Sequence, residues 1–247
     1  EDFMPYTDAS YKLSIRFENF YKNGDGGFHY PFGEVIENNK IGLKQVWFLK
    51  KKENPDTPIT NYADSLYPNM ALVNHNVLFK NDDREIPEFD FKRHVAYHFD
   101  ATKLGFKSLL LGKTLKEHFN DYSKLLVNNK AWATRVPYKD KQKELVPYTN
   151  CTAIENGWVW NIPSWERIGT GYVYSSKYLS QEEAEKEFSS YLGNKDLKFS
   201  HTKMRIGRHE KTWVGNVVAI GLSAGFIEPL ESNGLLTVHD NLLSLVK

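Results

Sequence analysis

The sequence VGNVVAIGLSAGFIEPLESNG, at residues 214–234, predicts a buried strand that leads through a tight turn into a helix. Residues 217–220 form a short apolar run of strand type, and the small residues at 221–225 let the backbone turn tightly. The helical pattern begins at Leu235, and Glu231 lies just ahead of it. Because the first N–H groups of a helix lack internal partners and carry partial positive charge, this segment predicts a cradle for an anion, a phosphate or an electron-rich ring edge.

The composition is that of an ordinary globular protein. The chain has 247 residues, of which 40% are hydrophobic, and a formal net charge of +1. Repeats and low-complexity tracts are absent, so one interwoven domain is favoured over two. The balanced charge gives no indication of a nucleic acid or an acidic membrane as partner. The lysine run at residues 50–52 is interpreted as the solvated flank of a loop.

The single cysteine, Cys151, excludes an internal disulfide and suits a reducing compartment. Without a cysteine neighbour, a nucleophilic or metal-binding role is the less favoured alternative, so no metal site is predicted. No apolar run reaches the roughly 18 residues that span a membrane, and no signal-peptide pattern opens the chain. We therefore expect a soluble, cytoplasmic protein.

Hydrophobic patterns along the chain predict a mixed α/β fold that is rich in strands. In SYKLSIRFENF, Tyr11, Leu13, Ile15 and Phe17 alternate with polar residues, which is the period of a half-buried strand with Lys12 pointing away from its apolar face. Further strands are expected at residues 44–48, 131–136, 157–162 and 170–175. An aromatic loop is expected at residues 29–33, a helix entry capped by Asp100 at 97–101, and a helix at 181–192.

Two features outside residues 214–234 also bear on function. In WVWNIP, at residues 158–163, Trp158 and Trp160 are two positions apart on a predicted strand and therefore face the same side. Core packing alone explains such a pair of indoles. Lys12, on the polar face of its strand, would by itself simply meet water. The turn and helix of residues 214–234 also fit an ordinary connection, so each pattern alone leaves the function open.

Together these three patterns resemble the flavin-dependent tryptophan halogenases. WVWNIP fits the W-x-W-x-I-P signature of that family, GLSAGFIEPLES fits its strap motif beside the flavin, and Tyr11-Lys12 fits its catalytic-lysine strand. Blocks such as YHFDA, AWATRVPY and RIGTGYVYSS agree in order, so the resemblance covers nearly the whole chain. It implies an α/β fold like that of flavin monooxygenases, of the glutathione-reductase type, with mixed sheets and helices.

The resemblance also implies a reaction. Reduced FAD from a separate flavin reductase, O2 and a halide ion would yield hypohalous acid, which would travel through a tunnel to a small aromatic substrate of the tryptophan, indole or phenol type. Lys12 would meet this oxidant, either by donating a hydrogen bond to it or by forming a haloamine. Glu231 corresponds to the second essential residue of the family, which orients the lysine and stabilises the positive charge that develops on the arene.

The remaining site residues follow from the same resemblance. Backbone N–H groups of Asn233 and Gly234 would hold the halide, although the family usually has threonine where Asn233 stands, which puts the halide preference in doubt. The residues expected to wall off the flavin from the substrate are Trp158, Trp160, Ile162 and Pro163. The residues expected to contact FAD are Gly221, Ser223, Ala224, Pro229, Ser232, Gly234 and Leu235.

The substrate pocket departs from the tryptophan-specific pattern. Those relatives clasp the indole with a histidine and a phenylalanine in an H-x-F-G arrangement, whereas this chain has Tyr30, Pro31, Phe32 and Gly33. Phe32 is retained, and Tyr30 can still stack on an arene. An aromatic substrate is therefore expected, but free tryptophan does not follow from the sequence.

Two further departures concern the length of the chain. The family's G-x-G-x-x-G turn, which binds the FAD pyrophosphate, has no counterpart here, and the blocks that meet at Gly105 and Phe106 are separated in the family. We therefore expect residues 1–247 to be a partial single domain with a junction at 105/106. A flavin monooxygenase that hydroxylates its substrate, and a degenerate non-catalytic homologue, remain the alternative functions. The oligomeric state is left open.

Overall fold

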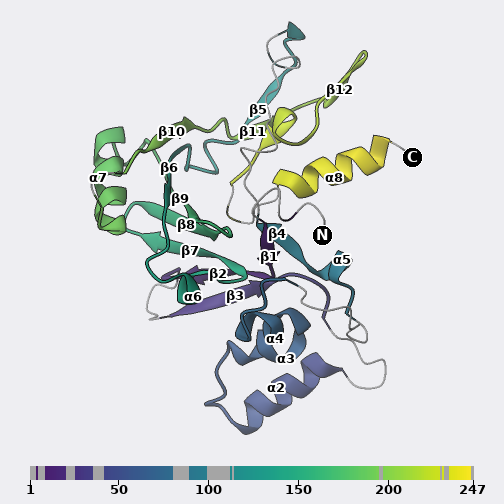
Figure 1. The fold of residues 1–247 in the computed structure, drawn as a ribbon. Coiled ribbons are helices and arrows are strands. Elements are labelled where there is room, and N and C mark those ends of the chain that lie inside the picture. Colours follow the sequence, from purple (N-terminus) through teal and green to yellow (C-terminus); the bar gives the residue numbers. More distant parts are fainter. Residues whose placement is uncertain are drawn as a thin grey trace. The chain divides into compact units, whose positions relative to one another are not determined.

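The protein is described from a computed structural model, in residues 4, 9–20, 26–35, 42–79, 89–98, 112, 114–194, 197–228, 230 and 234–245. Helices and strands alternate irregularly along the chain, which confirms the predicted mixed α/β class (Figure 1). The strands are β1 Ser10–Lys12, β2 Ser14–Glu18, β3 Gly27–Pro31, β4 Ala96–His98, β5 Phe119–Asp121, β6 Lys130–Val136, β7 Tyr148–Ile154, β8 Gly157–Pro163, β9 Ile168–Tyr174, β10 Ser200–Lys203, β11 Gly207–His209, β12 Trp213–Val214, β13 Val217–Val218 and β14 Gly225–Phe226. The helices are α2 Leu43–Glu53, α3 Asn61–Leu66, α4 Pro68–Asn74, α5 Phe91–His94, α6 Lys141–Glu144, α7 Gln181–Leu192 and α8 Gly234–Leu245.

The strands form mixed sheets. The largest sheet has seven strands in the order β10-β6-β9-β8-β7-β2-β3. In it, β2 pairs antiparallel with β3 and parallel with β7, so strands far apart in the sequence become neighbours. Smaller sheets are formed by β1 with β4, by β14, β11 and β5, and by β12 with β13.

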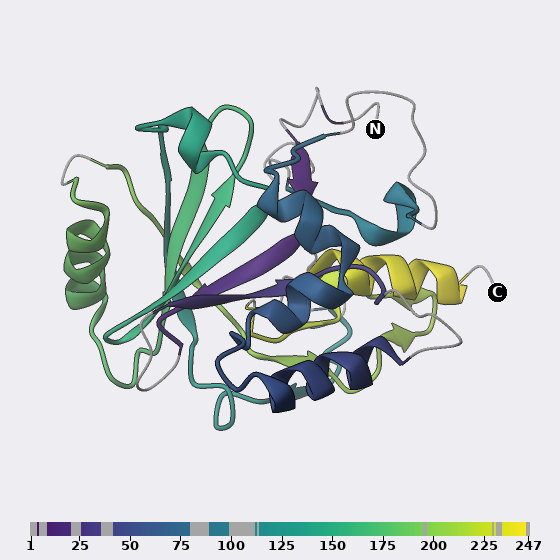
Figure 2. The same ribbon diagram turned by 90° about the horizontal axis from the view of Figure 1, so that it is seen from below.

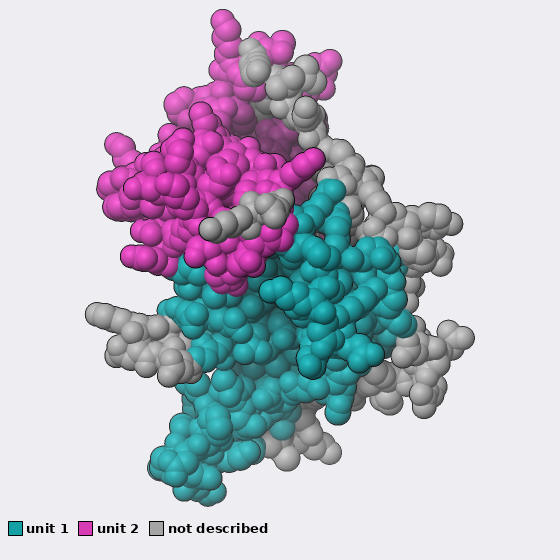
Figure 3. Space-filling model, turned by 60° about the vertical axis from the view of Figure 1, so that its left-hand side comes forward, with its two compact units in different colours: residues 1–101, 135–154, 159–170 teal, residues 102–134, 155–158, 171–247 magenta. Residues whose placement is uncertain are grey.

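The chain divides into two compact units (Figure 3). The first contains residues 1–101, 135–154 and 159–170, and the second contains residues 102–134, 155–158 and 171–247. In the first unit, helices α2, α3 and α4 lie together beside β2 and β3 (Figures 1 and 2). The expectation of a single domain stays a prediction, and Gly105 and Phe106 lie outside the described residues.

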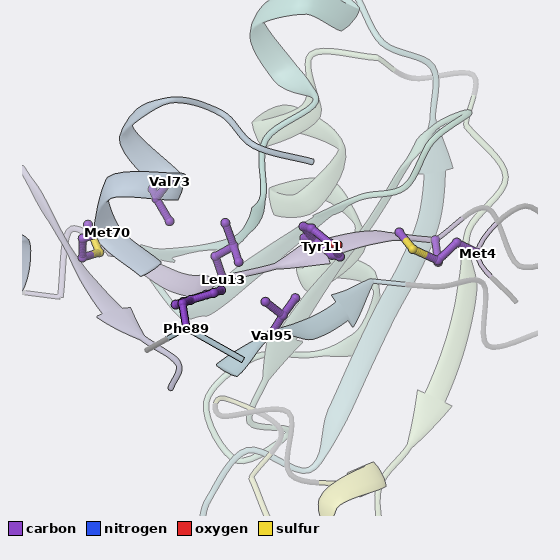
Figure 4. Packing of buried hydrophobic residues seen from close by; sticks show 8 residues of the cluster. Met4, Tyr11, Leu13, Met70, Val73, Phe89 and Val95 are labelled. Atoms are coloured by element: carbon purple, nitrogen blue, oxygen red, sulfur yellow. The ribbon is translucent and has the colours of Figure 1, made fainter. Parts of the chain in front are cut away.

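The core of the first unit is built around β1. Tyr11 and Leu13 belong to one buried hydrophobic cluster with Met70 and Val73 of α4 and with Val95 (Figure 4). Burial of such side chains contributes roughly 1.5 to 3 kcal/mol each. This packing confirms the apolar face that the alternation at residues 11–17 predicts.

The opposite face of the same segment differs from the prediction. Ser10, Lys12 and Ser14 are also buried, so this strand region is covered on both faces rather than half-buried. Residues near this buried polar face include His98 of β4, which shares the face of Lys12, and Cys151 of β7. A lysine on the polar face therefore does not reach water here.

The predicted strand at residues 44–48 is wrong, because these residues lie in α2. Val46 and Phe48 are exposed and Trp47 is buried, so the apolar triplet does not form a core strand. The run continues into leucine, lysine and glutamate, which are strong helix formers. The lysines at residues 50–52, predicted to flank a loop, instead occupy the last turn of α2, where cations interact favourably with helix carbonyls.

Two further local predictions are corrected. The expected helix entry at residues 97–101 is the strand β4 at Tyr97 and His98, whose backbone pairs with β1; Asp100 lies outside the described residues. The expected aromatic loop at 29–33 is largely the strand β3, which pairs along its whole length with β2. In both cases long-range strand pairing overrides the local pattern.

The other predicted elements are confirmed. The strands at residues 131–136, 157–162 and 170–175 correspond to β6, β8 and β9. Helix α7 occupies the predicted residues 181–192, and its N-terminus carries a reciprocal capping box between Ser180 and Glu183. It ends at Gly193, whose φ of 65° suits a left-handed C-terminal cap.

The segment at residues 214–234 contains more short elements than the predicted strand, turn and helix. Val217 and Val218 form half-exposed β13, a short hairpin partner of β12, instead of a buried strand. The expected turn is present as a 3-10 turn, Gly221–Ser223, but β14 follows before α8 begins at Gly234. Within the described ranges, none of the helices has the length and apolar character needed to cross a bilayer.

Candidate functional site

Lys12 ends β1 and is almost completely buried, with 6% of its surface exposed. The antiparallel pairing of β1 with β4 places Lys12 opposite Ala96, and Ser10 opposite His98. Directly opposed residues, and residues two apart on one strand, point to the same face, so Lys12 and His98 share a face of this ladder. Tyr11 points the other way, into the core cluster.

Burial changes the acid–base chemistry of Lys12. Removal of the ammonium group from water lowers the pKa of Lys12 from 10.5 to about 8, while the neighbouring Cys151 acts in the opposite direction. About one tenth of such a group is neutral amine at pH 7. The Nζ atom lies 5.2 Å from the centre of the Phe32 ring, within the range of a cation–π contact. Lys12 can therefore act as a hydrogen-bond donor or as a nucleophilic amine.

His98 stays neutral beside this lysine. It is 3% exposed, and its Nε2 atom lies 2.9 Å from Oγ1 of Thr149 on β7. Burial, and then the positive charge of Lys12, hold the pKa of His98 well below its usual value, while the Pro163 carbonyl acts in the opposite direction. The histidine therefore adds no second positive charge to the surroundings of Lys12.

Phe32 is held in place through its backbone. Its N–H donates to the carbonyl of Leu13 at 2.9 Å, and Asn69 donates from Nδ2 to the Phe32 carbonyl at 2.8 Å. Asn69 also donates to the carbonyl of Leu13 at 3.4 Å, so one buried amide ties together the backbone on either side of the lysine–arene contact. Tyr30 is 52% exposed, and its ring meets that of Phe32 edge-on with centres 6.5 Å apart.

Cys151 lacks the exposure and the lowered pKa of a reactive thiol, although Lys12 lies near it. It is 1% exposed, and burial raises the pKa of its thiol to about 12. Within the described ranges, no three His, Cys, Asp or Glu side chains are arranged to bind a metal ion.

In the second unit, Trp158 is 6% exposed and donates from its indole Nε1 to Oε1 of Glu228 at 2.9 Å. Glu228 lies in the motif GFIEPLES, so two segments picked out by the sequence meet through side chains. The carboxylate also accepts a hydrogen bond from Asn128. Burial raises the pKa of Glu228, and the two hydrogen bonds act in the opposite direction.

The rest of WVWNIP lies in the first unit. Trp160 and Ile162 are half-buried on β8, and the Trp160 carbonyl accepts from Thr170 Oγ1 at 3.0 Å. Pro163 is buried, and its carbonyl accepts a hydrogen bond of 3.3 Å from Ser10. The end of the motif is therefore connected to β1, two residues before Lys12.

The turn before α8 is shaped by Gly221 and Ser223. Gly221 has a φ of +58°, and a Cβ atom there would lie 2.4 Å from Cγ2 of Val238 in α8, so only glycine fits without displacement. The Ser223 hydroxyl accepts from the Ile220 N–H at 2.8 Å and donates to the Ile220 carbonyl at 2.7 Å. Ser223 thus fixes the turn, and Ala224 follows it half-buried.

Gly234 begins the 12-residue helix α8 and is exposed. Apart from its chain neighbours and its own helix, no described residue lies within 4 Å of the position where a Cβ would stand at Gly234. Of the other predicted strap residues, Pro229, Glu231, Ser232 and Asn233, together with the Leu235 side chain, lie outside the described residues.

Three residues of these sites were not found from the sequence. His98 and Asn69 are buried polar residues whose partners come from distant segments, and Glu228 meets an indole 70 positions away. Only Glu228 gave a local signal, since it lies in the strap motif. The structure brings together Lys12 and Phe32, to which the predictions assign a catalytic role and a substrate role respectively.

Comparisons with known proteins identify close relatives over the whole chain. The family model described as "Tryptophan halogenase" matches residues 1–104 and 103–247. The curated 7-chloro-L-tryptophan 6-halogenase KtzR of Kutzneria sp. (strain 744) is 32% identical over 319 residues, which cover 100% of this chain and 60% of KtzR. The tryptophan 7-halogenase RebH of Lentzea aerocolonigenes is 31% identical over 306 residues, covering 100% of this chain and 58% of RebH.

Solved structures agree with these matches. The apo structure of VirX1 is 39% identical and superposes with a TM-score of 0.88, covering 100% of this chain and 58% of VirX1. Tar14, a tryptophan C-6 flavin-dependent halogenase from taromycin biosynthesis, is 30% identical with a TM-score of 0.80, covering 98% of this chain and 58% of Tar14. The likeness confirms the fold predicted from the sequence. The chain spans 58–60% of the length of the two curated relatives.

Proposed function

The chain belongs to the tryptophan halogenase family, and we propose that it acts in a flavin-dependent halogenase that modifies an electron-rich aromatic compound. Reduced FAD, O2 and a halide ion are its proposed reagents, with the reduced flavin supplied by a separate reductase. Tryptophan, indole and phenol types are the proposed substrate classes. The activity is proposed for the whole protein.

The buried Lys12 is the observation that carries this proposal. Lys12 is 6% exposed, and its pKa is lowered to about 8. Burying this side chain lowers the stability of the folded protein, because burial disfavours the charged form. Such perturbed groups concentrate at functional sites. As an ammonium group Lys12 would donate a hydrogen bond to the oxygen of hypohalous acid, and as a neutral amine it would accept the halogen. Neutral His98 leaves both forms accessible.

The residues near α8 fit a flavin and a halide. Bound reduced FAD would supply electrons to O2, which also takes electrons from the halide, so that hypohalous acid, water and oxidised FAD result. Gly221, Ser223, Ala224 and Gly234 would contact it through a backbone whose turn is fixed by the Ser223 hydroxyl. The proposal extends to Pro229, Ser232 and Leu235 for FAD, to the N–H groups of Asn233 and Gly234 for the halide, and to Glu231 as the carboxylate partner of Lys12.

The substrate side is proposed to include Tyr30 and Phe32. The exposed Tyr30 ring offers a stacking surface, and Phe32 already lies against the Lys12 ammonium group. Trp158, Trp160, Ile162 and Pro163 would keep the substrate away from the flavin, so that transfer takes place only through the oxidant that reaches Lys12.

Product mass tests the proposed function. The full-length protein, given externally reduced FAD, O2 and either chloride, bromide or iodide, is incubated with a panel of indoles and phenols. We expect products whose mass follows the halide supplied, with the paired isotope peaks of bromine in the bromide reaction. A hydroxylated product without halogen would assign the protein to the flavin monooxygenases instead. Flavin titration of the same protein reports binding separately from turnover.

A further inference from the structure

Glu228 has contacts that the proposed roles of the strap do not use. Its Oε1 atom accepts the Trp158 indole N–H at 2.9 Å, and its carboxylate also accepts a hydrogen bond from Asn128. All three residues belong to the second unit. The indole has one N–H, so this contact uses its entire polar capacity.

The contact fixes the position of a large side chain. Trp158 is 6% exposed, whereas Glu228 is half-buried. A hydrogen bond to an ionised acceptor is roughly twice as strong as one between neutral groups. Losing a hydrogen bond to a buried donor costs about 1 to 3 kcal/mol where no water replaces it. The carboxylate therefore contributes to the orientation of the indole ring.

The backbone before Glu228 is itself firmly held. In β14, Gly225 lies opposite Arg208 and Phe226 lies opposite Gly207. A Cβ atom at Gly225 would lie 2.6 Å from the Gly207 carbonyl oxygen, so the two backbones are in close contact. Glu228 follows two residues after this strand, so its side chain projects from an anchored segment.

We propose that Glu228 is a positioning residue, which holds the Trp158 indole and so keeps the tryptophan wall in place during halogenation. This role rests on the proposed function and is distinct from that of Glu231, three residues later. Without the carboxylate, the Trp158 indole loses one of the contacts that fix its orientation. Flavin oxidation then continues, but less of it yields halogenated product.

The first test observes the contact without any turnover. The full-length protein is labelled with 15N at its tryptophan indoles, and the Trp158→Phe variant identifies the Trp158 Nε1–H resonance. We expect this resonance to move with pH as Glu228 titrates, with a midpoint above the ordinary value for glutamate, since burial raises its pKa. In Glu228→Gln the amide oxygen still accepts, so the resonance stays near its wild-type position but no longer titrates.

Asn128→Ala provides a matched control. It removes the other donor to the carboxylate, so the titration should move to higher pH while the indole N–H contact persists. A Trp158 resonance in Glu228→Ala that coincides with the wild type at all pH values would overturn the proposal. The position of the Trp158 resonance does not depend on halogenation. The experiment therefore distinguishes failure of the positioning role from failure of the proposed function.

The second test measures coupling in the active protein. Halogenated product per flavin oxidised should fall about tenfold in Glu228→Ala and remain within about twofold of wild type in Glu228→Gln. Trp158→Phe keeps a smaller aromatic ring and loses the N–H, so we expect Glu228→Ala to cause little further loss in the Trp158→Phe background. Independent, multiplying losses would overturn the proposal, as would an equally large loss in Glu228→Gln.

Discussion

The Nζ atom of Lys12 lies 5.2 Å from the centre of the Phe32 ring, and both residues are held by backbone contacts around Leu13. Phe32 partly replaces the water that the buried ammonium group has lost, since the face of an aromatic ring carries negative charge density. The contact connects the proposed reactive lysine to the proposed substrate side. It makes the chemistry of Lys12 sensitive to changes in one neighbouring ring.

Lys12 should destabilise the folded protein near neutral pH. Its pKa is 10.5 in the unfolded chain and about 8 in the folded protein, so the unfolded state binds more protons between these values. The free energy of unfolding therefore rises with pH across this window. We expect Lys12→Met to be more stable than wild type by about 3 kcal/mol at pH 7 and to lose this advantage above pH 10.5. Urea denaturation of both proteins across pH 7 to 11 measures the difference, and a pH-independent difference contradicts the assignment.

Phe32→Leu should make the Lys12 ammonium group harder to form. Loss of the aromatic face removes a favourable contact with the cation and lowers the pKa of Lys12 further. We compare Phe32→Leu with the double variant that also carries Lys12→Met. The difference in their unfolding free energies should begin to change at a lower pH than the difference between wild type and Lys12→Met. Tyr30→Leu removes an exposed ring that meets Phe32 edge-on, and it should leave the window unchanged. If this pH range is the same in Phe32→Leu as in wild type, the Phe32 ring does not affect the pKa of Lys12.

Gly221→Ala should be more damaging than Gly215→Ala. Both glycines have a φ of +58°, so both substitutions carry the same backbone strain. A Cβ atom at Gly215 meets nothing within 4 Å, whereas one at Gly221 lies 2.4 Å from Val238. We expect a loss of about 1 kcal/mol for Gly215→Ala and about 2 kcal/mol more for Gly221→Ala. Thermal denaturation compares them, and equal losses would mean that the turn does not pack against α8 as described.

Cys151 should resist modification in the native protein. Its thiol is 1% exposed, and its pKa is raised to about 12, so little thiolate forms at pH 8. Peptide mapping after treatment with iodoacetamide should find Cys151 unmodified in native protein and fully modified in guanidinium. Rapid native labelling would show that β7 opens readily around it.

The sequence predicted local features well and distant contacts poorly. The alternation at Tyr11 and Leu13 identified the apolar face, and the pattern at residues 181–192 identified helix α7. The burial of Lys12 was not predicted, because the segments around it come from distant parts of the chain, such as β4, more than 80 positions away. A local hydrophobic period does not reveal such neighbours. The helix α2 was missed because a short apolar triplet around Trp47 looks the same in a strand and in a helix.

The site shows the same division. The family resemblance assigned Lys12 and Phe32, and the structure brings them together. It did not indicate the pKa of Lys12, which depends on burial, or the neutrality of His98. Glu228 was passed over in favour of Glu231, because a hydrogen bond between residues 70 positions apart leaves no pattern in a single sequence.

Removing the Lys12 amine shows directly whether this residue takes part in halogenation. Wild-type and Lys12→Ala full-length protein receive the same reduced FAD, O2, bromide and aromatic substrate, and both flavin oxidation and brominated product are followed. We predict that the variant oxidises flavin at the wild-type rate while brominated product falls below about one hundredth of wild type. Undiminished bromination by Lys12→Ala would show that Lys12 has no role in the mechanism.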